Sequence, residues 1–229
     1  MLVFASCSVV VSLARVESRA FKISIVASML ALTAVFELIN RALPLRVPWG
    51  MSIDFVALPV MIVFLTLGMR YSLLTAVGMF FILIIIGFAG FVGAVMKFSA
   101  TVPMVLVLGG LALTPLKNKD IPGLTYRSIS KFILAAALAI VARCAVAVLI
   151  NYYWAIPLFF SMPVEQVIQS FFFGSIWGFV SFVSAMNVTQ GVIDLAVAWV
   201  IVFGFGLAKQ LLMPKVPQSA LQANHELSF

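Results

Sequence analysis

The chain has 229 residues, of which 64% are hydrophobic and only 9% are charged, and its mean hydropathy is +1.22. A soluble domain carries roughly 25% charged residues, so this composition excludes a soluble globule, a disordered chain, a coiled coil and a disulfide scaffold. Long uninterrupted apolar runs also exclude a transmembrane barrel, whose strands alternate. We therefore expect an all-α polytopic membrane protein. Because each spanning helix needs about 20 residues, no room is left for a soluble ATP-binding or catalytic domain.

Six long apolar segments predict six transmembrane helices. A further apolar stretch, 164–186, either spans the membrane as well or lies at the outer face as a helical or re-entrant segment. We expect residues 1–21 to be an N-terminal extension, 22–212 the transmembrane substrate-binding domain and 213–229 a polar cytoplasmic tail. The six predicted spans lie near residues 22–40, 54–70, 72–93, 99–115, 130–150 and 187–211.

The basic residues orient these helices. With six spans and both termini in the cytoplasm, ten of the 14 Lys and Arg residues lie inside, as the positive-inside rule requires. If 164–186 also spanned, Lys209 and Lys215 would move outside, so we place this stretch at the outer face. The prediction is a multi-pass protein of the cell membrane, surrounded by lipid. Its net charge of +7 is that of cytoplasmic loops and predicts no nucleic-acid partner.

Few polar residues fall inside the apolar segments, where such residues face a protein interior or a cavity. In the sixth span Asn187, Gln190 and Asp194 are spaced i, i+3 and i+7 and share one helix face. In the fifth span Arg143 and Asn151 also share a face. Counted from the outer ends, Arg143 and Asp194 lie about 12 and about 10.5 Å deep at 1.5 Å per residue. We predict a structural ion pair between them, and ligand contact for Asn187 and Gln190, with interhelical hydrogen bonding as the alternative.

More polar residues gather at the predicted outer ends of the other spans. Asp54 begins the second span, Lys97 follows the third and Thr101 begins the fourth. Glu37 and Asn40 end the first span. The alternatives to a site are an ion pair between Glu37 and Arg41, four residues apart, and capping of helix ends by Asp54 and Lys97. This asymmetry predicts a solute site that opens to the outside. 

The loop 41–53 contains two prolines and Trp49. An interfacial tryptophan is commonly a membrane anchor, and a lid over an outward-facing pocket is the alternative with a functional consequence.

The sequence lacks the residues that a metal site or an enzyme active site would need. Cys7 and Cys144 lie far apart, and the only histidine, His225, is in the polar tail, so we expect no metal and no cofactor. A small intramembrane enzyme is an alternative, but it needs His and Arg clusters or paired aspartates, and the carboxylates here are scattered. A passive channel would show polar stripes along whole helices. We therefore expect no catalytic residue.

Four motifs, in order along the chain, resemble a known family. They are the small pair Ala27 and Ala31, Ser-Ile-Asp-Phe-Val-Ala-Leu-Pro at 52–59, Leu-Gly at 67–68, and Ala-Met-Asn-Val-Thr-Gln-Gly at 185–191. In these motifs the chain resembles the substrate-binding S component of an energy-coupling factor (ECF) vitamin transporter, closest to the riboflavin type. The resemblance implies a protein that captures a vitamin-like small molecule from outside, with a transmembrane coupling subunit and two ATPase subunits as partners.

The resemblance also implies roles for single residues. Ala27 and Ala31, with Ala34 one turn further, would form the docking face for the coupling subunit. Asn187 and Asn151 would contact the ligand, whereas Gln190 stands where the motif has a lysine, so a charged donor is lost.

Riboflavin or a related flavin is the expected ligand, and another vitamin or small solute is the alternative. Asp54, Lys97 and Thr101 complete the predicted site, and aromatic side chains are expected to stack on the flat ring. These aromatic residues are Trp49, Tyr152 and Trp154.

Overall fold

The computed structural model describes residues 19–43, 46–48, 50–113 and 122–207. In these ranges the chain is helical, and its extended pairing is limited to an isolated bridge between Arg46 and Ser52. The predicted extension and tail fall outside the described residues, except that the first helix already begins at Arg19. The described helices are α2 (Arg19–Ala42), α3 (Leu58–Leu67), α4 (Met69–Ile86), α5 (Gly90–Leu113), η1 (Pro122–Arg127), α6 (Ile129–Ile150), η2 (Asn151–Ala155), α7 (Ile156–Phe160), α8 (Val164–Phe171), α9 (Ile176–Trp199) and η3 (Val200–Gly204).

Five of the helical segments in the described part are long and apolar enough to cross a membrane, and α3 is a shorter apolar helix. At 1.5 Å per residue, the ten residues of α3 cover about 15 Å, half of a hydrocarbon core. All of them from Leu58 to Thr66 are buried, so α3 is the centre of the bundle. Non-helical chain such as Met51–Ala57, which leads into α3, is tolerated at membrane depth where protein covers it.

The turn between α4 and α5 lies earlier than the sequence predicts. α4 ends at Ile86 and α5 begins at Gly90, whereas the expected loop was 94–98. Hydropathy does not locate this turn, because the chain is apolar on both sides of it. The glycines locate it: Gly90 has a positive φ of 51°, and a Cβ at Gly87 would collide with the backbone oxygen of Leu83. Lys97 is therefore two turns inside α5, not in an outer loop.

The last span also begins earlier than predicted. Ser175 caps α9, its hydroxyl accepting a hydrogen bond from the backbone N–H of Gly178, and α9 runs from Ile176. Only α8 forms the separate outer segment that the sequence analysis expected, and 176–186 belongs to the last span. Asn187 consequently lies about 16 Å along α9 rather than at its end.

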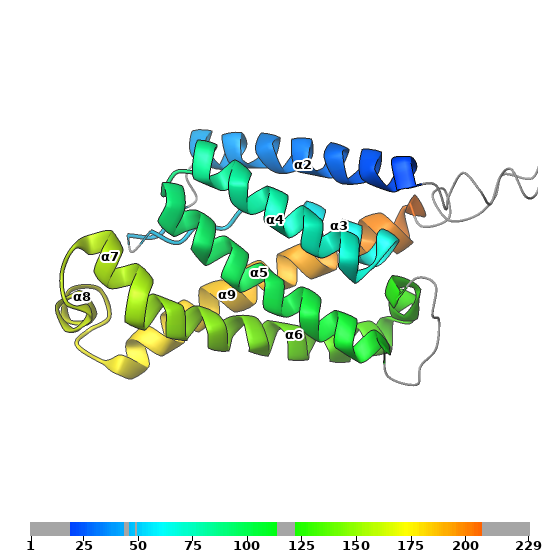
Figure 1. The fold of residues 1–229 in the computed structure, drawn as a ribbon. Coiled ribbons are helices and arrows are strands. Elements are labelled where there is room, and N and C mark those ends of the chain that lie inside the picture. The colour runs from blue at the N-terminus through cyan, green and yellow to red at the C-terminus, as the bar shows by residue number, and fades with distance from the viewer. Residues whose placement is uncertain (1–18, 44–45, 49, 114–121, 208–229) are drawn as a thin grey trace, which may run out of the picture.

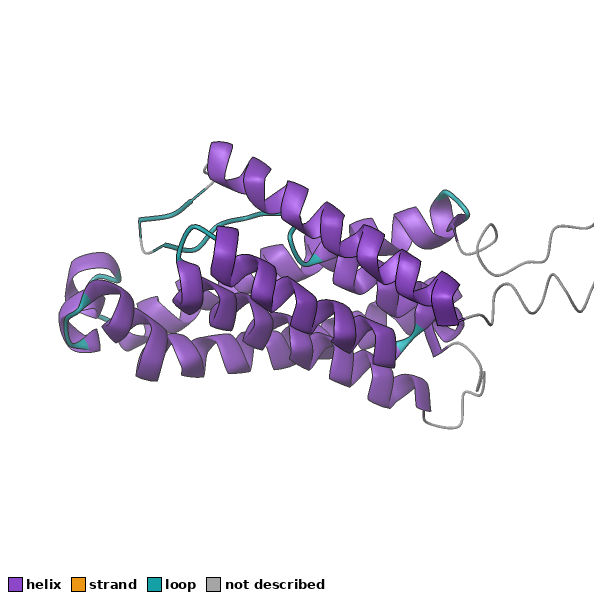
Figure 2. Cartoon of the chain, turned by 45° about the horizontal axis from the view of Figure 1, so that its top comes forward, coloured by secondary structure: helices purple, strands orange, loops and turns teal. Residues whose placement is uncertain are grey.

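The long helices pack side by side, as Figure 1 and Figure 2 show. Both ends of the described chain, at α2 and η3, lie at one end of the bundle, which we call the terminal end. The helices α7 and α8 lie at the opposite end, which we call the pocket end. One apolar core surrounds α3, and a second, smaller one joins α7, α8 and the start of α9.

Candidate functional site

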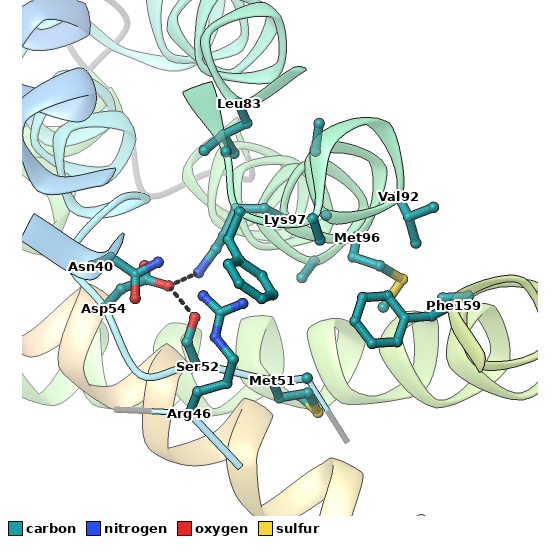
Figure 3. Close-up of a pocket in the computed structure, with 18 of the residues that line it drawn as sticks. Asn40, Arg46, Met51, Ser52, Asp54, Leu83, Val92, Met96, Lys97 and Phe159 are labelled. Atoms are coloured by element: carbon teal, nitrogen blue, oxygen red, sulfur yellow. Dashed lines mark hydrogen bonds and ion pairs between the residues drawn. The ribbon is translucent and has the colours of Figure 1, made fainter. Parts of the chain in front are cut away.

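A pocket of about 150 Å³ lies toward the pocket end of the bundle (Figure 3). Its walls come from α2, the segment before α3, the end of α4 and the α4–α5 turn, α5, the rod of α6, η2 and α7, and α9. Most of the lining is apolar, with a smaller number of polar groups, as in small-molecule sites generally. The polar and charged residues that line it are Glu37, Asn40, Arg46, Ser52, Asp54, Lys97, Arg143, Asn151, Asn187 and Gln190.

Asp54 joins two walls of the pocket. Its Oδ2 accepts from Lys97 Nζ at 2.6 Å and from Ser52 Oγ at 3.1 Å, and its Oδ1 accepts from the backbone N–H of Val56 at 3.0 Å. The Asp54 side chain is 2% exposed and that of Lys97 is 16% exposed. This partly buried ion pair, drawn as a dashed line in Figure 3, fixes the segment before α3 against α5.

Gln190 attaches the same segment to α9. Its Oε1 accepts from the backbone N–H of Asp54 at 3.0 Å, and its Nε2 donates to the Asp54 carbonyl at 2.6 Å. The same Nε2 donates to Asp194 Oδ1 at 2.9 Å. The amide thus pairs with the Asp54 backbone as a neighbouring strand would, and every polar atom of Gln190 is used within the protein.

The ion pair predicted between Arg143 and Asp194 is present. Arg143 Nη1 lies 3.3 Å from Asp194 Oδ2, and the side chains are 3% and 0% exposed. Arg143 Nε also donates to Asn187 Oδ1 at 3.1 Å, and Asn187 Nδ2 donates to the Val183 carbonyl at 2.9 Å. Asn187 therefore lines the pocket while its amide orients Arg143.

Asn151 faces the pocket from a π-helical turn, η2, which interrupts the rod formed by α6 and α7. Its Nδ2 donates to the Ala147 carbonyl at 2.7 Å. Single π turns inside α-helices are frequent at functional sites. The helix continues beyond Asn151 to Phe160. The prediction that Asn151 lies at the outer end of its span is therefore wrong.

Other predicted site residues lie elsewhere. Thr101 does not line the pocket: it is fully buried, and its hydroxyl donates to the Lys97 carbonyl at 2.7 Å within α5. Tyr152 and Trp154 are also outside the lining. Trp49 lies outside the described residues.

Aromatic lining comes instead from Phe88 and Phe159. Tyr152 packs against Phe179 with ring centroids 5.9 Å apart, and Trp154 packs against Phe91 at 6.3 Å. Periodicity could not identify Phe88 and Phe159, because they belong to the α4–α5 turn and to the rod beyond the predicted end of the fifth span.

Arg46, which the sequence analysis assigned no role, also lines the pocket. Its guanidinium carbon lies 3.6 Å from the ring centroid of Phe88. Burial lowers the pKa of Arg46 from its ordinary value, although the charges of Glu37 and Asp54 oppose that shift. The signal that could have found Arg46 is its position as a basic residue within the proline-rich outer loop 41–53, the predicted lid.

The pairing of Glu37 with Arg41 is wrong. Glu37 Oε1 accepts from the backbone N–H of Phe88 and its Oε2 from Asn40 Nδ2, both at 3.1 Å. Arg41 instead donates to the Ile86 carbonyl at 2.9 Å. Glu37 is turned toward the bundle, where it is 4% exposed, whereas Arg41 is exposed.

Outside the pocket, Ala27 and Ala31 lie on the exposed face of α2, while Ala34 is half-buried. Within the described ranges, no group of three or more His, Cys, Asp or Glu residues could hold a metal ion.

No family model matches the sequence, and no curated protein matches it. A solved structure of the S component of a bacterial ECF transporter does match, with a TM-score of 0.58 at 18% sequence identity. The match covers 86% of this chain and 100% of that one. The chain has the fold of an S component. This agrees with the all-α polytopic membrane fold expected from the sequence, and at 18% identity the likeness is one of fold.

Proposed function

We propose that the protein is the membrane-embedded substrate-binding subunit of an ECF-type importer. The observation that carries the proposal is the S-component fold over the full length of the matched chain, combined with a polar pocket at one end of the bundle. Such a subunit binds a solute and delivers it through partner chains, so the proposal assigns no catalytic residue and no cofactor to this chain.

The distribution of charge supports an outward-facing pocket. Basic residues gather at the terminal end, in the first turns of α2, at the start of α4 and around η1, and the positive-inside rule places such an end in the cytoplasm. With both termini inside, the pocket end faces out. The loop 41–53 is proposed to act as the lid of the pocket, because its residues Arg46, Gly50, Met51 and Ser52 line it.

We further propose a flavin, with riboflavin first, as the solute. The motif at 185–191 resembles the riboflavin type, and the pocket offers aromatic walls at Phe88 and Phe159 beside side-chain amides. Its two ion pairs, Asp54 with Lys97 and Arg143 with Asp194, are internally compensated, which suits an uncharged ligand. Another vitamin or small solute is the alternative.

A riboflavin titration tests this assignment. On titration into the purified protein, we expect saturable quenching of flavin fluorescence at micromolar or lower concentration, because the ring would stack on the aromatic walls. Lumiflavin, which lacks the ribityl chain, is the control that separates ring recognition from chain recognition. Absence of quenching at micromolar riboflavin removes the riboflavin assignment and leaves the S-subunit proposal to the following test.

The exposed alanines of α2 are proposed to dock the transmembrane coupling subunit, which in turn binds two ATPases. Ala27 and Ala31 leave a shallow strip on the helix, and small residues permit close approach of a partner helix. We expect the double variant Ala27→Leu/Ala31→Leu to abolish co-purification with co-expressed coupling and ATPase subunits and to leave solute binding within about twofold, since the strip is outside the pocket.

Ala137→Leu is the matched control, because Ala137 is an exposed alanine on α6. It should co-purify with the partners as the wild type does. Retention of the complex by the α2 double variant, or its loss in Ala137→Leu, would contradict the assignment of this face.

A further inference from the structure

A second polar cluster in the pocket takes no part in the two ion pairs. It consists of Glu37 and Asn40 of α2, Arg46 of the following loop and Phe88 of the α4–α5 turn, all of which line the pocket. Both carboxylate oxygens of Glu37 are occupied, one by Asn40 Nδ2 and one by the Phe88 backbone N–H. The guanidinium of Arg46 lies over the Phe88 ring.

Two polar atoms of this cluster are buried and have no hydrogen-bond partner among the described residues: Asn40 Oδ1, an acceptor, and Arg46 Nε, a donor. The amide orientation of Asn40 follows from Glu37, because a carboxylate only accepts and must face the NH₂ group. Asn40 is 7% exposed, and its oxygen is buried in the pocket wall. Buried polar atoms in folded proteins almost always have partners, and the exceptions call for an explanation.

The charges around these two atoms favour a neutral ligand group. Neither of the ion pairs among the described residues includes Glu37, and the charges of Glu37 and Asp54 both act on Arg46. An anionic group would meet the carboxylate of Glu37, and a cationic group would meet Arg46. A neutral ligand edge that carries one donor and one acceptor avoids repulsion by both Glu37 and Arg46. It also provides hydrogen-bond partners for Asn40 Oδ1 and Arg46 Nε.

The shape of the cluster favours a flat ligand. The planar guanidinium of Arg46 and the ring of Phe88 lie against each other at 3.6 Å, so this wall already accepts stacked planar groups. Arg46 comes from the loop rather than from a helix and is only partly buried, so it can move with the loop as a ring enters. Figure 3 shows the Arg46 side chain directed into the pocket.

We propose that Asn40 and Arg46 recognise the amide or imide edge of a flat heteroaromatic ligand. Asn40 Oδ1 accepts from a ring N–H, and Arg46 donates to the neighbouring ring carbonyl. This inference rests on the proposed solute-binding function and names the chemical class of the solute and the side chains that select it.

The test compares riboflavin with N3-methylriboflavin, whose imide N–H is blocked, on the purified full chain in lipid nanodiscs. We expect the wild type to bind riboflavin at least tenfold more tightly than the methylated compound. Asn40→Leu should weaken the binding of riboflavin at least tenfold and leave the affinity for the methylated compound unchanged, so that the preference for riboflavin disappears. Thr33→Val is the matched control: Thr33 is buried two turns earlier in α2, bonds only to the Met29 carbonyl and is outside the pocket lining, so its variant should keep the preference.

Equal wild-type affinity for the two compounds, or a preference that survives in Asn40→Leu, would overturn the inference. If Asn40→Leu does not fold, Arg46→Lys provides the test, because this variant keeps the positive charge but loses both Nε and the planar group that stacks on Phe88. We expect it to lower the affinity for riboflavin at least tenfold, and an unchanged affinity would overturn the inference.

The flavin assignment can fail separately. If riboflavin does not bind the wild type, thermal shifts with lumazine and N3-methyllumazine provide the same comparison on another imide ring. A wild-type shift with lumazine that N3-methylation or Asn40→Leu removes supports the inference and excludes flavin. Absence of binding by both ring systems overturns the inference, while co-purification with the coupling and ATPase subunits reports independently on the S-subunit function.

Discussion

Replacing Arg143 by methionine should destabilise the protein by about 3–5 kcal/mol, because it leaves a buried carboxylate without its counter-ion. Arg143 and Asp194 are 3% and 0% exposed and lie 3.3 Å apart between α6 and α9. The substitution also removes the donor to Asn187 Oδ1, so a second polar group loses its partner. Only the bond from Gln190 Nε2 then remains to Asp194. Reversible unfolding in mixed detergent micelles, followed by tryptophan fluorescence, measures the loss.

The double variant Arg143→Met/Asp194→Asn separates loss of the charge pair from loss of packing. An asparagine is neutral and can still accept from Gln190, so we expect the double variant to recover more than half of the lost stability. A double variant as unstable as Arg143→Met would mean that packing of the arginine, not the unpaired charge, dominates. Wild-type stability in Arg143→Met would refute the role of the pair altogether.

Replacing Lys97 by methionine should release the segment before α3 and weaken solute binding about 100-fold. The bond to Asp54 Oδ2 is 2.6 Å long, and removal of one partner of a buried pair costs about 3 kcal/mol or more, which corresponds to about two orders of magnitude in affinity. The Asp54 carboxylate keeps Ser52 and the Val56 N–H, so the chain should still fold. Hydrogen–deuterium exchange of 46–57 reports the release directly and needs no ligand.

Lys97→Arg is the conservative control and should keep slow exchange in 46–57, because it retains a cation that can reach Asp54. The double variant Lys97→Gln/Gln190→Lys moves the cation from α5 to α9 without changing the net charge. We expect it to bind the solute more tightly than Lys97→Gln alone. Equal exchange rates in wild type and Lys97→Met would show that Gln190 alone holds the segment.

The position of Lys97 in the structure also corrects an expectation about the charge of the site. From the motif at 185–191, Gln190 implied that the site had lost a cation. The structure places Lys97 Nζ and the Gln190 amide on the same residue, Asp54, from two different helices. The pocket therefore retains a lysine, supplied by α5. A motif read along one segment cannot reveal this, because the compensating residue lies 93 positions away in sequence.

The relative depth of two residues in the membrane can be predicted from the sequence where both lie within continuous helices. Arg143 and Asp194 were predicted to pair because a fixed rise per residue converts sequence distance into depth, and both helices are regular between the counted positions. Both starting points were displaced, since the rod of α6, η2 and α7 continues past Asn151 to Phe160 and α9 begins at Ile176. The two errors have the same direction, so the relative depth of the two charges survived.

The sequence by itself determined the all-α membrane fold, because hydropathy and helical period are properties of consecutive residues. Of the nine residues that it predicted for the site, the three aromatic ones included, five line the pocket. Only the tertiary structure decided which polar atoms remain available. Asn187 and Gln190, the predicted ligand contacts, use their amides in hydrogen bonds to Arg143 and Asp54. Asn40 and Arg46, in contrast, keep an acceptor and a donor that have no partner in the described part of the chain. Hydrogen bonding is pairwise and directional, so it depends on which helices meet in space, and a single segment carries no record of its neighbours.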